Sequence, residues 1–160
     1  MNIKCFLIIG VCLFFASCGE NKKDKDSSIQ HIQELKKYLK DKNLHKTKGF
    51  QVYVLLQPEF CGSCTRQIQE FVKHQLVTCN NSHKTLILSS DNENVVKLFS
   101  GVELLEIIIE EEIHLQKYDL ANGLELFLSE NEGKEVKSGI INLEEIEAGL
   151  SFCKDTTPKL

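Results

Sequence analysis

The stretch that decides the fold is Phe60-Cys61-Gly62-Ser63-Cys64-Thr65, which separates two different sequence patterns. Before it, residues 50–56 form a continuous apolar run, which predicts a strand buried on both faces of a sheet. After it, apolar side chains recur at steps of three and four residues over 62–77, which predicts a helix with one apolar face. The order strand, Cys-x-x-Cys, helix therefore places Cys61 at the start of a helix.

A position at a helix start favours the thiolate form of Cys61. The unpaired amide N–H groups and the dipole at this end of a helix stabilise a negative charge. In Cys-x-x-Cys sites of this kind the pKa of a thiol falls from about 8.5 to roughly 3.5–7.5, so a thiolate is present at neutral pH. The pattern predicts thiol–disulfide exchange, in which Cys61 attacks and Cys64 resolves the mixed disulfide.

A Cys-x-x-Cys pair also occurs in zinc sites and in structural disulfides. Zinc would need two further ligands, and Cys79 and Cys153 form no second Cys-x-x-Cys pair. We therefore predict no metal site and no cofactor, and we interpret Glu110-Glu111-Glu112 as a solvated run. The redox dithiol is favoured over the inert disulfide, and both readings stay open.

Residues 1–17 have the pattern of a secretory signal. Lys4 supplies a positive charge, and Phe6–Phe15 is apolar but too short for a stable membrane span. Phe15-Ala16-Ser17-Cys18 resembles the lipobox of bacterial lipoproteins, in which the cysteine is diacylated and becomes the N-terminus. This predicts lipidation at Cys18 and a protein anchored to a membrane of the bacterial cell envelope, facing the periplasm or the cell surface. An ordinary signal peptide and an uncleaved anchor are the alternatives.

The remaining chain is predicted to hold one domain. Residues 18–28 are almost without apolar side chains and are interpreted as a flexible tether. Residues 29–153 are long enough for a single domain with its own core, and 154–160 form a C-terminal tail. With 19 Lys and Arg against 23 Asp and Glu, and no basic cluster beside aromatic side chains, nucleic-acid binding is not supported.

Hydrophobic periodicity predicts alternating helices and strands through the domain. A strand–helix–strand unit with a right-handed crossover makes its two strands parallel neighbours, and a polar turn at 130–133 predicts a β-hairpin. Residues 104–109 fit a short strand or the end of a helix. Helices are expected over about 29–43, 62–77, 92–100, 113–121 and 143–151, and strands over 50–56, 85–89, 124–128 and 135–141.

This order of elements resembles the thioredoxin family over about residues 50–152, and most of all its membrane-anchored, thioredoxin-like lipoproteins. Phe60 stands where that family usually has an aromatic residue before the first cysteine. The resemblance implies an α/β, thioredoxin-like fold, in which helices flank a central mixed β-sheet and the Cys-x-x-Cys motif lies at the strand-to-helix junction. It implies a lipid-anchored thiol–disulfide oxidoreductase that acts on protein thiols or disulfides of the envelope. The alternative is a non-catalytic binding or accessory lipoprotein with a structural disulfide.

Two positions depart from the family pattern. The family has a cis-proline before the first hairpin strand, facing the dithiol, but residues 120–124 contain no proline. Many members also carry a buried acid six residues before the first cysteine, where this chain has Leu55. Both departures favour the non-catalytic alternative, so enzymatic activity stays open. His74, His83 and His114 are expected to be surface residues without a catalytic role.

The resemblance also implies a structural disulfide between Cys79 and Cys153. In the thioredoxin-like arrangement the dithiol helix and the final helix lie on one face of the sheet, and their C-terminal ends converge at the pole opposite the active site. Cys79 follows the first helix and Cys153 the second, so their Cα atoms are expected within the roughly 4.4–6.8 Å of a disulfide. Two separate buried thiols are the alternative.

Overall fold

The computed structural model of the chain describes residues 22–57, 62–89, 92–121 and 124–153. Within these ranges, five strands form one mixed sheet with the order β3-β2-β1-β4-β5. The strands are β1 (Phe50–Leu56), β2 (His83–Leu88), β3 (Leu105–Ile109), β4 (Leu126–Asn131) and β5 (Lys134–Ile140). The helices are α1 (Lys22–Asp41), α2 (Gly62–Thr78), α3 (Glu93–Leu98), α4 (Glu112–Gln116) and α5 (Leu143–Glu147).

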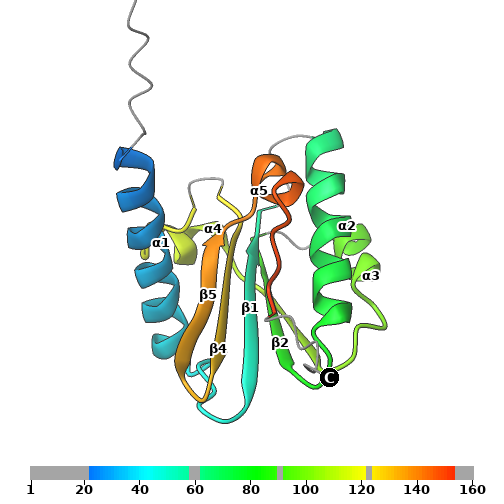
Figure 1. Cartoon of the computed structure of the whole chain (residues 1–160), viewed down its shortest axis with the longest axis horizontal. Helices are drawn as coiled ribbons and strands as arrows, with labels where there is room; N and C mark the ends of the chain where they lie inside the picture. The colour runs from blue at the N-terminus through cyan, green and yellow to red at the C-terminus, as the bar shows by residue number, and fades with distance from the viewer. Residues whose placement is uncertain (1–21, 58–61, 90–91, 122–123, 154–160) are drawn as a thin grey trace, which may run out of the picture.

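Helices cover both faces of the sheet (Figure 1). Val52, Val54 and Leu56 of β1 pack in one core with residues of α2, α3 and α5. Tyr53 and Leu55 pack in a second core with residues of α1 and α4. Alternate side chains of β1 therefore point into opposite cores, which explains why its sequence is a continuous apolar run. The predicted central mixed sheet flanked by helices is confirmed.

The strand pairing agrees with the thioredoxin-like arrangement predicted from the sequence. β1 and β2 are parallel and are connected through α2, as a crossover unit requires. β4 runs antiparallel to β1 and continues into β5 as a hairpin. Residues 105–109 form β3, which extends the sheet as a parallel edge strand beside β2, so the ambiguous stretch 104–109 is largely a strand.

Helix α1 begins earlier than the sequence pattern predicts. It starts at Lys22, inside the segment 18–28 that was interpreted as a flexible tether. The later part of α1 is held by Ile32, Leu35 and Leu39, which are 6 %, 0 % and 0 % exposed. Because the packed part already forms a helix, adding polar turns at its N-terminus requires no new nucleation.

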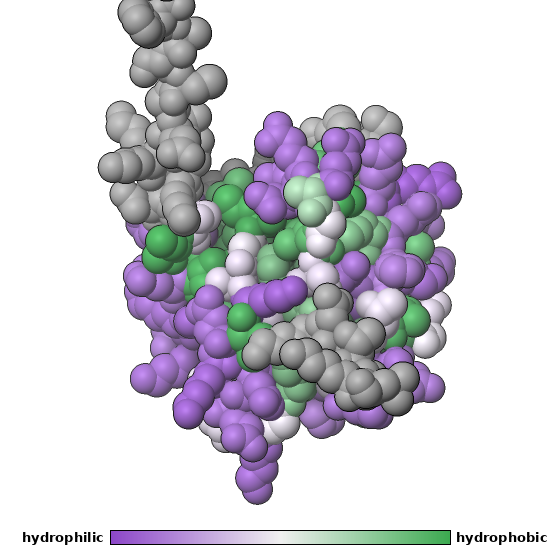
Figure 2. Space-filling view, viewed as in Figure 1, coloured by the Kyte–Doolittle hydropathy of each residue, from purple (hydrophilic) through white to green (hydrophobic). Residues whose placement is uncertain are grey.

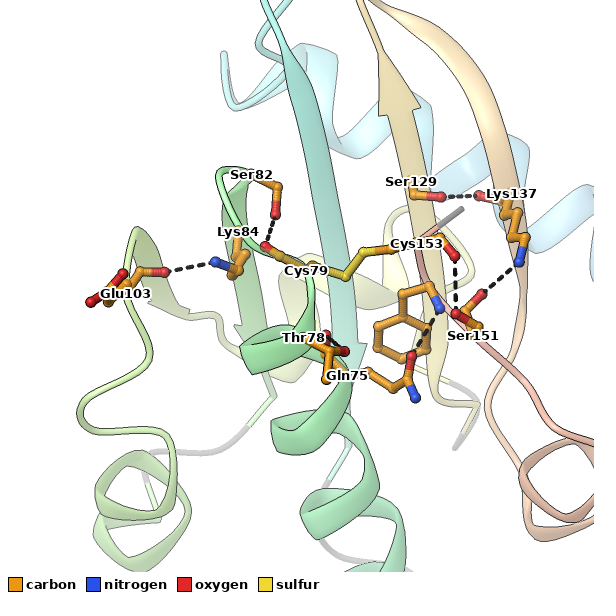
Figure 3. The surroundings of a disulfide bond; sticks show 11 residues. Gln75, Thr78, Cys79, Ser82, Lys84, Glu103, Ser129, Lys137, Ser151 and Cys153 are labelled. Carbon is orange, nitrogen blue, oxygen red and sulfur yellow. Dashed lines mark hydrogen bonds between the residues drawn. A yellow bond between two sulfur atoms is a disulfide. The ribbon is translucent and has the colours of Figure 1, made fainter. Parts of the chain in front are cut away.

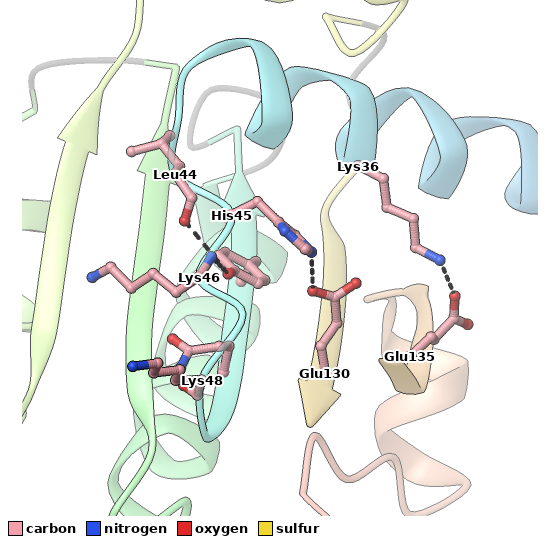
Figure 4. Close-up of polar contacts among 9 residues, drawn as sticks. Lys36, Leu44, His45, Lys46, Lys48, Glu130 and Glu135 are labelled. Atoms are coloured by element: carbon pink, nitrogen blue, oxygen red, sulfur yellow. Dashed lines mark hydrogen bonds and ion pairs between the residues drawn. The ribbon is translucent and has the colours of Figure 1, made fainter. Parts of the chain in front are cut away.

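Polar contacts tie α1 and the loop after it to the sheet (Figure 4). His45 Nε2 lies 2.8 Å from the carboxylate of Glu130 in β4. Glu130 is 2 % exposed. Lys36 of α1 pairs with Glu135 of β5 at 2.5 Å. The backbone N–H of Lys46 donates to the Tyr53 hydroxyl at 3.0 Å. Glu130 and Tyr53 are the buried residues of this set, whereas Lys36 and Glu135 are partly exposed.

The surface in the view of Figure 2 is hydrophilic around its rim, with apolar side chains gathered between α1 and α5. None of the helices in the described part of the chain is long and apolar enough to cross a membrane.

Candidate dithiol site

The junction between β1 and α2 is the part of the fold that carries the Cys-x-x-Cys motif. β1 ends at Leu56, and α2 begins at Gly62, so the backbone of Cys64 lies in the first turn of the helix. The structure thus describes only the second cysteine of the predicted motif. The other two residues predicted for chemistry, Cys61 and Cys18, lie outside the described residues.

Packing of α2 fixes where its first turn lies. Val72 and Leu76 are fully buried and Ile68 is nearly so, and all three belong to the core that also contains Leu56. The helix therefore starts at the edge where the parallel strands end and runs back along the sheet (Figure 1). Its start exposes the amide N–H groups that favour a thiolate at a neighbouring cysteine.

The strand end that leads to the motif is tied to the segment before β4 by Gln57. This side chain is 4 % exposed, and its Nε2 donates to the carbonyl oxygens of Leu120 at 2.5 Å and Leu124 at 3.3 Å. Sequence reasoning missed this role. The sequence shows only that a polar residue stands between an apolar strand and Pro58. It does not reveal the partners of Gln57, because they lie far along the chain.

Position 55, where the family has an acid, is filled by apolar packing. Leu55 is fully buried, and it lies in the core formed with α1 and α4. His74 and His83 are exposed, as predicted. His114 is also exposed, but it is paired with a buried glutamate, which the sequence did not reveal.

That glutamate, Glu110, corrects the interpretation of residues 110–112 as a solvated run. Glu111 and Glu112 are exposed, but Glu110 is 7 % exposed. Its backbone N–H donates to Leu88 O at 2.8 Å, which continues the parallel ladder beyond β3 and places its side chain in the fold. The interpretation fails because the backbone of Glu110 is still hydrogen-bonded to β2, although two exposed acidic residues follow it directly.

Three side chains surround the Glu110 carboxylate. The Tyr38 hydroxyl donates to Oε2 at 2.9 Å, Lys42 Nζ lies 2.8 Å from the same oxygen, and His114 Nδ1 lies 2.6 Å from Oε1. Burial by itself would raise the pKa of Glu110, but the hydrogen bonds from Lys42, His114 and Tyr38 outweigh it and lower the pKa to about 2. Burial and the neighbouring carboxylate raise the pKa of Tyr38.

Cys79 and Cys153 are joined by a disulfide, with their Cα atoms 5.8 Å apart (Figure 3). Cys79 directly follows α2, so the bridge lies at the end of that helix away from the Cys-x-x-Cys motif. Phe152, next to Cys153, stacks on Phe127 of β4 with ring centroids 4.6 Å apart. Its backbone N–H donates to Gln75 Oε1 of α2 at 3.1 Å. The disulfide thus fastens the C-terminal segment to the end of α2, and the stacking of Phe152 on Phe127 fastens it to the sheet.

Within the described ranges, no three histidine, cysteine, aspartate or glutamate side chains are grouped so that they could hold a metal ion.

Comparison with known proteins finds similarity to solved structures only. No family model matches the chain, and no curated protein matches it. A thioredoxin-like protein from Parabacteroides distasonis is similar with a TM-score of 0.38 and 14 % identity, over 65 % of this chain and 81 % of that one. StoA from Bacillus subtilis is similar with a TM-score of 0.37 and 14 % identity, over 66 % of this chain and 84 % of that one. Similarity of this degree defines neither a family nor an activity for the chain.

Proposed function

We propose that the chain is a thioredoxin-like thiol–disulfide oxidoreductase, anchored by lipid at Cys18 in the bacterial envelope, with Cys61 and Cys64 as its redox pair. The observation that carries the proposal is the position of Cys64 in the first turn of α2, the helix that follows a buried parallel strand along the chain. A helix start supplies amide N–H groups to an adjacent thiolate, and Cys61 is the residue immediately before that start.

The proposed reaction moves two electrons between dithiol and disulfide. The Cys61 thiolate attacks one sulfur of a protein disulfide, which forms a mixed disulfide and releases the other substrate sulfur as a thiolate. The Cys64 thiolate then attacks the Cys61 sulfur, which releases the second substrate thiol and leaves a Cys61–Cys64 disulfide. The substrate is reduced and the chain is oxidised. The reverse sequence oxidises a substrate dithiol, and the reduction potential of the pair decides which direction operates.

The test is reduction of insulin by the full chain in detergent, with dithiothreitol as electron donor. We expect Cys61→Ser to fall to the rate without protein, because the thiol that attacks the substrate disulfide is gone. Reduced Cys64→Ser, mixed with insulin after dithiothreitol has been removed, is expected to accumulate a mixed disulfide with the substrate, because the resolving thiol is gone. A double Cys79→Ala, Cys153→Ala variant assayed below its melting temperature serves as the control and retains the rate. A wild-type rate equal to that of Cys61→Ser contradicts the proposal.

The two thiols are also expected to differ in reactivity. Cys61 adjoins the amide-rich start of α2, whereas Cys64 lies within the helix. Alkylation of the reduced chain at mildly acidic pH should therefore modify Cys61 first, as peptide mass spectrometry will show. Equal modification, or faster modification of Cys64, contradicts the assignment of Cys61 as the nucleophile.

The second candidate is a non-catalytic accessory lipoprotein, and the packing of Leu55 favours it. That position holds a fully buried leucine, not an acid that would exchange protons with the resolving cysteine. In this case Cys61 and Cys64 form a permanent disulfide. A reduction potential below about −300 mV, where structural disulfides of secreted proteins lie, would support this candidate.

Anchoring is tested separately at Cys18. We expect cleavage after residue 17 and an N-terminal peptide of the mature protein that carries the mass of acyl chains on Cys18. Cys18→Ser should prevent both the modification and the processing. A mature protein that begins at another residue, or an unmodified Cys18 in membrane fractions, contradicts the lipid anchor.

A further inference from the structure

The outer edge of β3 presents hydrogen-bonding groups of the backbone. Glu110 N donates to Leu88 O at 2.8 Å, so the even-numbered positions of this part of the chain face β2. Successive residues of a strand direct their N–H and C=O groups to opposite sides. The groups that point away from β2 therefore belong to Leu105, Ile107 and Ile109. In the part of the chain that the structure describes, β2 is the only strand that pairs with β3.

The side chains along this edge are apolar and exposed. No residue of β3 is buried, whereas five of the six residues of β2 are. Leu104 just before β3, Ile109 at its end and Ile113 in α4 are 53 %, 52 % and 65 % exposed. They are three of the five large apolar side chains that are exposed within the described ranges. Apolar side chains gathered in this way are typical of an interaction surface.

The other edge of the sheet, β5, has features that prevent strand addition. It carries Lys134 and Lys137, its ladder to β4 contains a register shift, and its Glu135 pairs with Lys36 of α1. Lysines, bulges and a covering helix are the usual protection of an edge strand. β3 contains no lysine, and its ladder to β2 runs without a register shift. The two edges therefore differ, and only β5 is protected by its own residues.

The charge around β3 is negative. Residues 103–114 contain five glutamates and no lysine or arginine. Two of the glutamates are paired, Glu110 within its cluster and Glu106 with Lys46. The other three are exposed: Glu103, Glu111 and Glu112. An apolar edge with acidic neighbours is complementary to a segment that carries apolar and basic side chains.

The same charges disfavour a second copy of this chain as the partner. Antiparallel pairing of two copies centred on Ile107, the middle residue of β3, sets Glu103 of each copy near Glu111 of the other. Like charges opposite each other destabilise a strand pair. The acidic neighbours thus select a partner of opposite charge.

We propose that the outer edge of β3 binds an extended segment of another protein, rich in apolar and basic side chains, as an added strand. The backbone of that segment pairs with Leu105, Ile107 and Ile109, which supplies affinity, and its side chains supply specificity. Its basic side chains lie near the exposed glutamates. No cysteine takes part, so this interaction does not depend on the proposed redox activity.

The test measures binding of a fluorescein-labelled ten-residue peptide of alternating lysine and valine to the full chain in detergent. The first control is the same peptide with all its backbone nitrogens methylated, which keeps the side chains but donates no backbone hydrogen bond. We expect it to bind at least about tenfold more weakly, because several hydrogen bonds are lost. A peptide of alternating glutamate and valine should also bind at least about tenfold more weakly, because its charge is reversed.

Variants of the chain test the contribution of charge. The double variant Glu103→Gln, Glu111→Gln should weaken binding of the lysine–valine peptide about fivefold, because two exposed charges near β3 are removed. The matched control is Glu144→Gln, Glu147→Gln in α5, which removes two exposed glutamates and changes the net charge equally. This control should change the affinity by less than about twofold.

Amide hydrogen exchange followed by nuclear magnetic resonance locates the peptide. Exchange at Leu105, Ile107 and Ile109 should slow at least about tenfold on binding, with no change along β5. The inference is overturned if the lysine–valine peptide does not bind, if the methylated peptide binds equally well, if the two double variants behave alike, or if protection appears along β5 instead. A chain that is dimeric without peptide, with these three amides already protected, assigns the edge to a second copy and overturns it as well.

Discussion

Removal of the disulfide in a double Cys79→Ala, Cys153→Ala variant is expected to lower the free energy of unfolding by about 4 kcal/mol. The bridge spans a sequence separation of 74 residues, and a cross-link over so long a loop greatly restricts the unfolded chain. For a domain of this size the loss corresponds to a melting temperature lower by more than about 10 °C. Circular dichroism during heating, with the full chain in detergent, gives the comparison.

Single variants provide the control for this expectation. Cys79→Ala and Cys153→Ala should each destabilise about as much as the double variant, because either change removes the same cross-link. In a Cys61→Ser, Cys64→Ser background, dithiothreitol should lower the melting temperature to that of the disulfide-free protein. A double variant that melts within about 3 °C of the wild type would show that the bridge contributes little to stability.

Most strands were predictable because local sequence determines them. β1 is apolar at nearly every position, since it lies between two cores, and its bounds agree with the predicted 50–56. The hairpin of β4 and β5 was also predicted, because its alternating residues flank a turn with Gly133 at φ +75°. A positive φ of this kind is more costly for residues other than glycine, so the glycine between the two strand segments indicates the turn.

The polar contacts were not predictable, because they join residues far apart in the chain. Glu110 is held by Tyr38 and Lys42 of α1, so its three-residue acidic run gave no sign that one member is buried. Gln57 finds its partners beyond residue 119. In each case burial is decided by tertiary packing and not by the residue's own neighbours, and only the folded chain reveals the partners.

Replacing Glu110 with glutamine is expected to remove stability in a way that depends on pH. The carboxylate has a folded-state pKa of about 2, against an ordinary value of 4.5, so its ionised form stabilises the fold by about 3 kcal/mol at neutral pH. Because the folded-state pKa is the lower one, this contribution is complete above about pH 4.5 and is lost as the pH falls toward about 2. Urea unfolding of wild type and Glu110→Gln at constant ionic strength measures the difference.

The difference between wild type and Glu110→Gln should therefore be largest at pH 7 and shrink steadily below about pH 4.5. Glu106→Gln is the matched control, because Glu106 also pairs with a lysine, Lys46 at 3.2 Å, but both side chains are nearly half exposed. Water screens such a pair, so this variant should change stability by less than about 1 kcal/mol at any pH. A Glu110→Gln effect that stays constant between pH 7 and pH 2.5, or that equals the Glu106→Gln effect, would mean that the contacts of Tyr38, Lys42 and His114 do not stabilise the carboxylate.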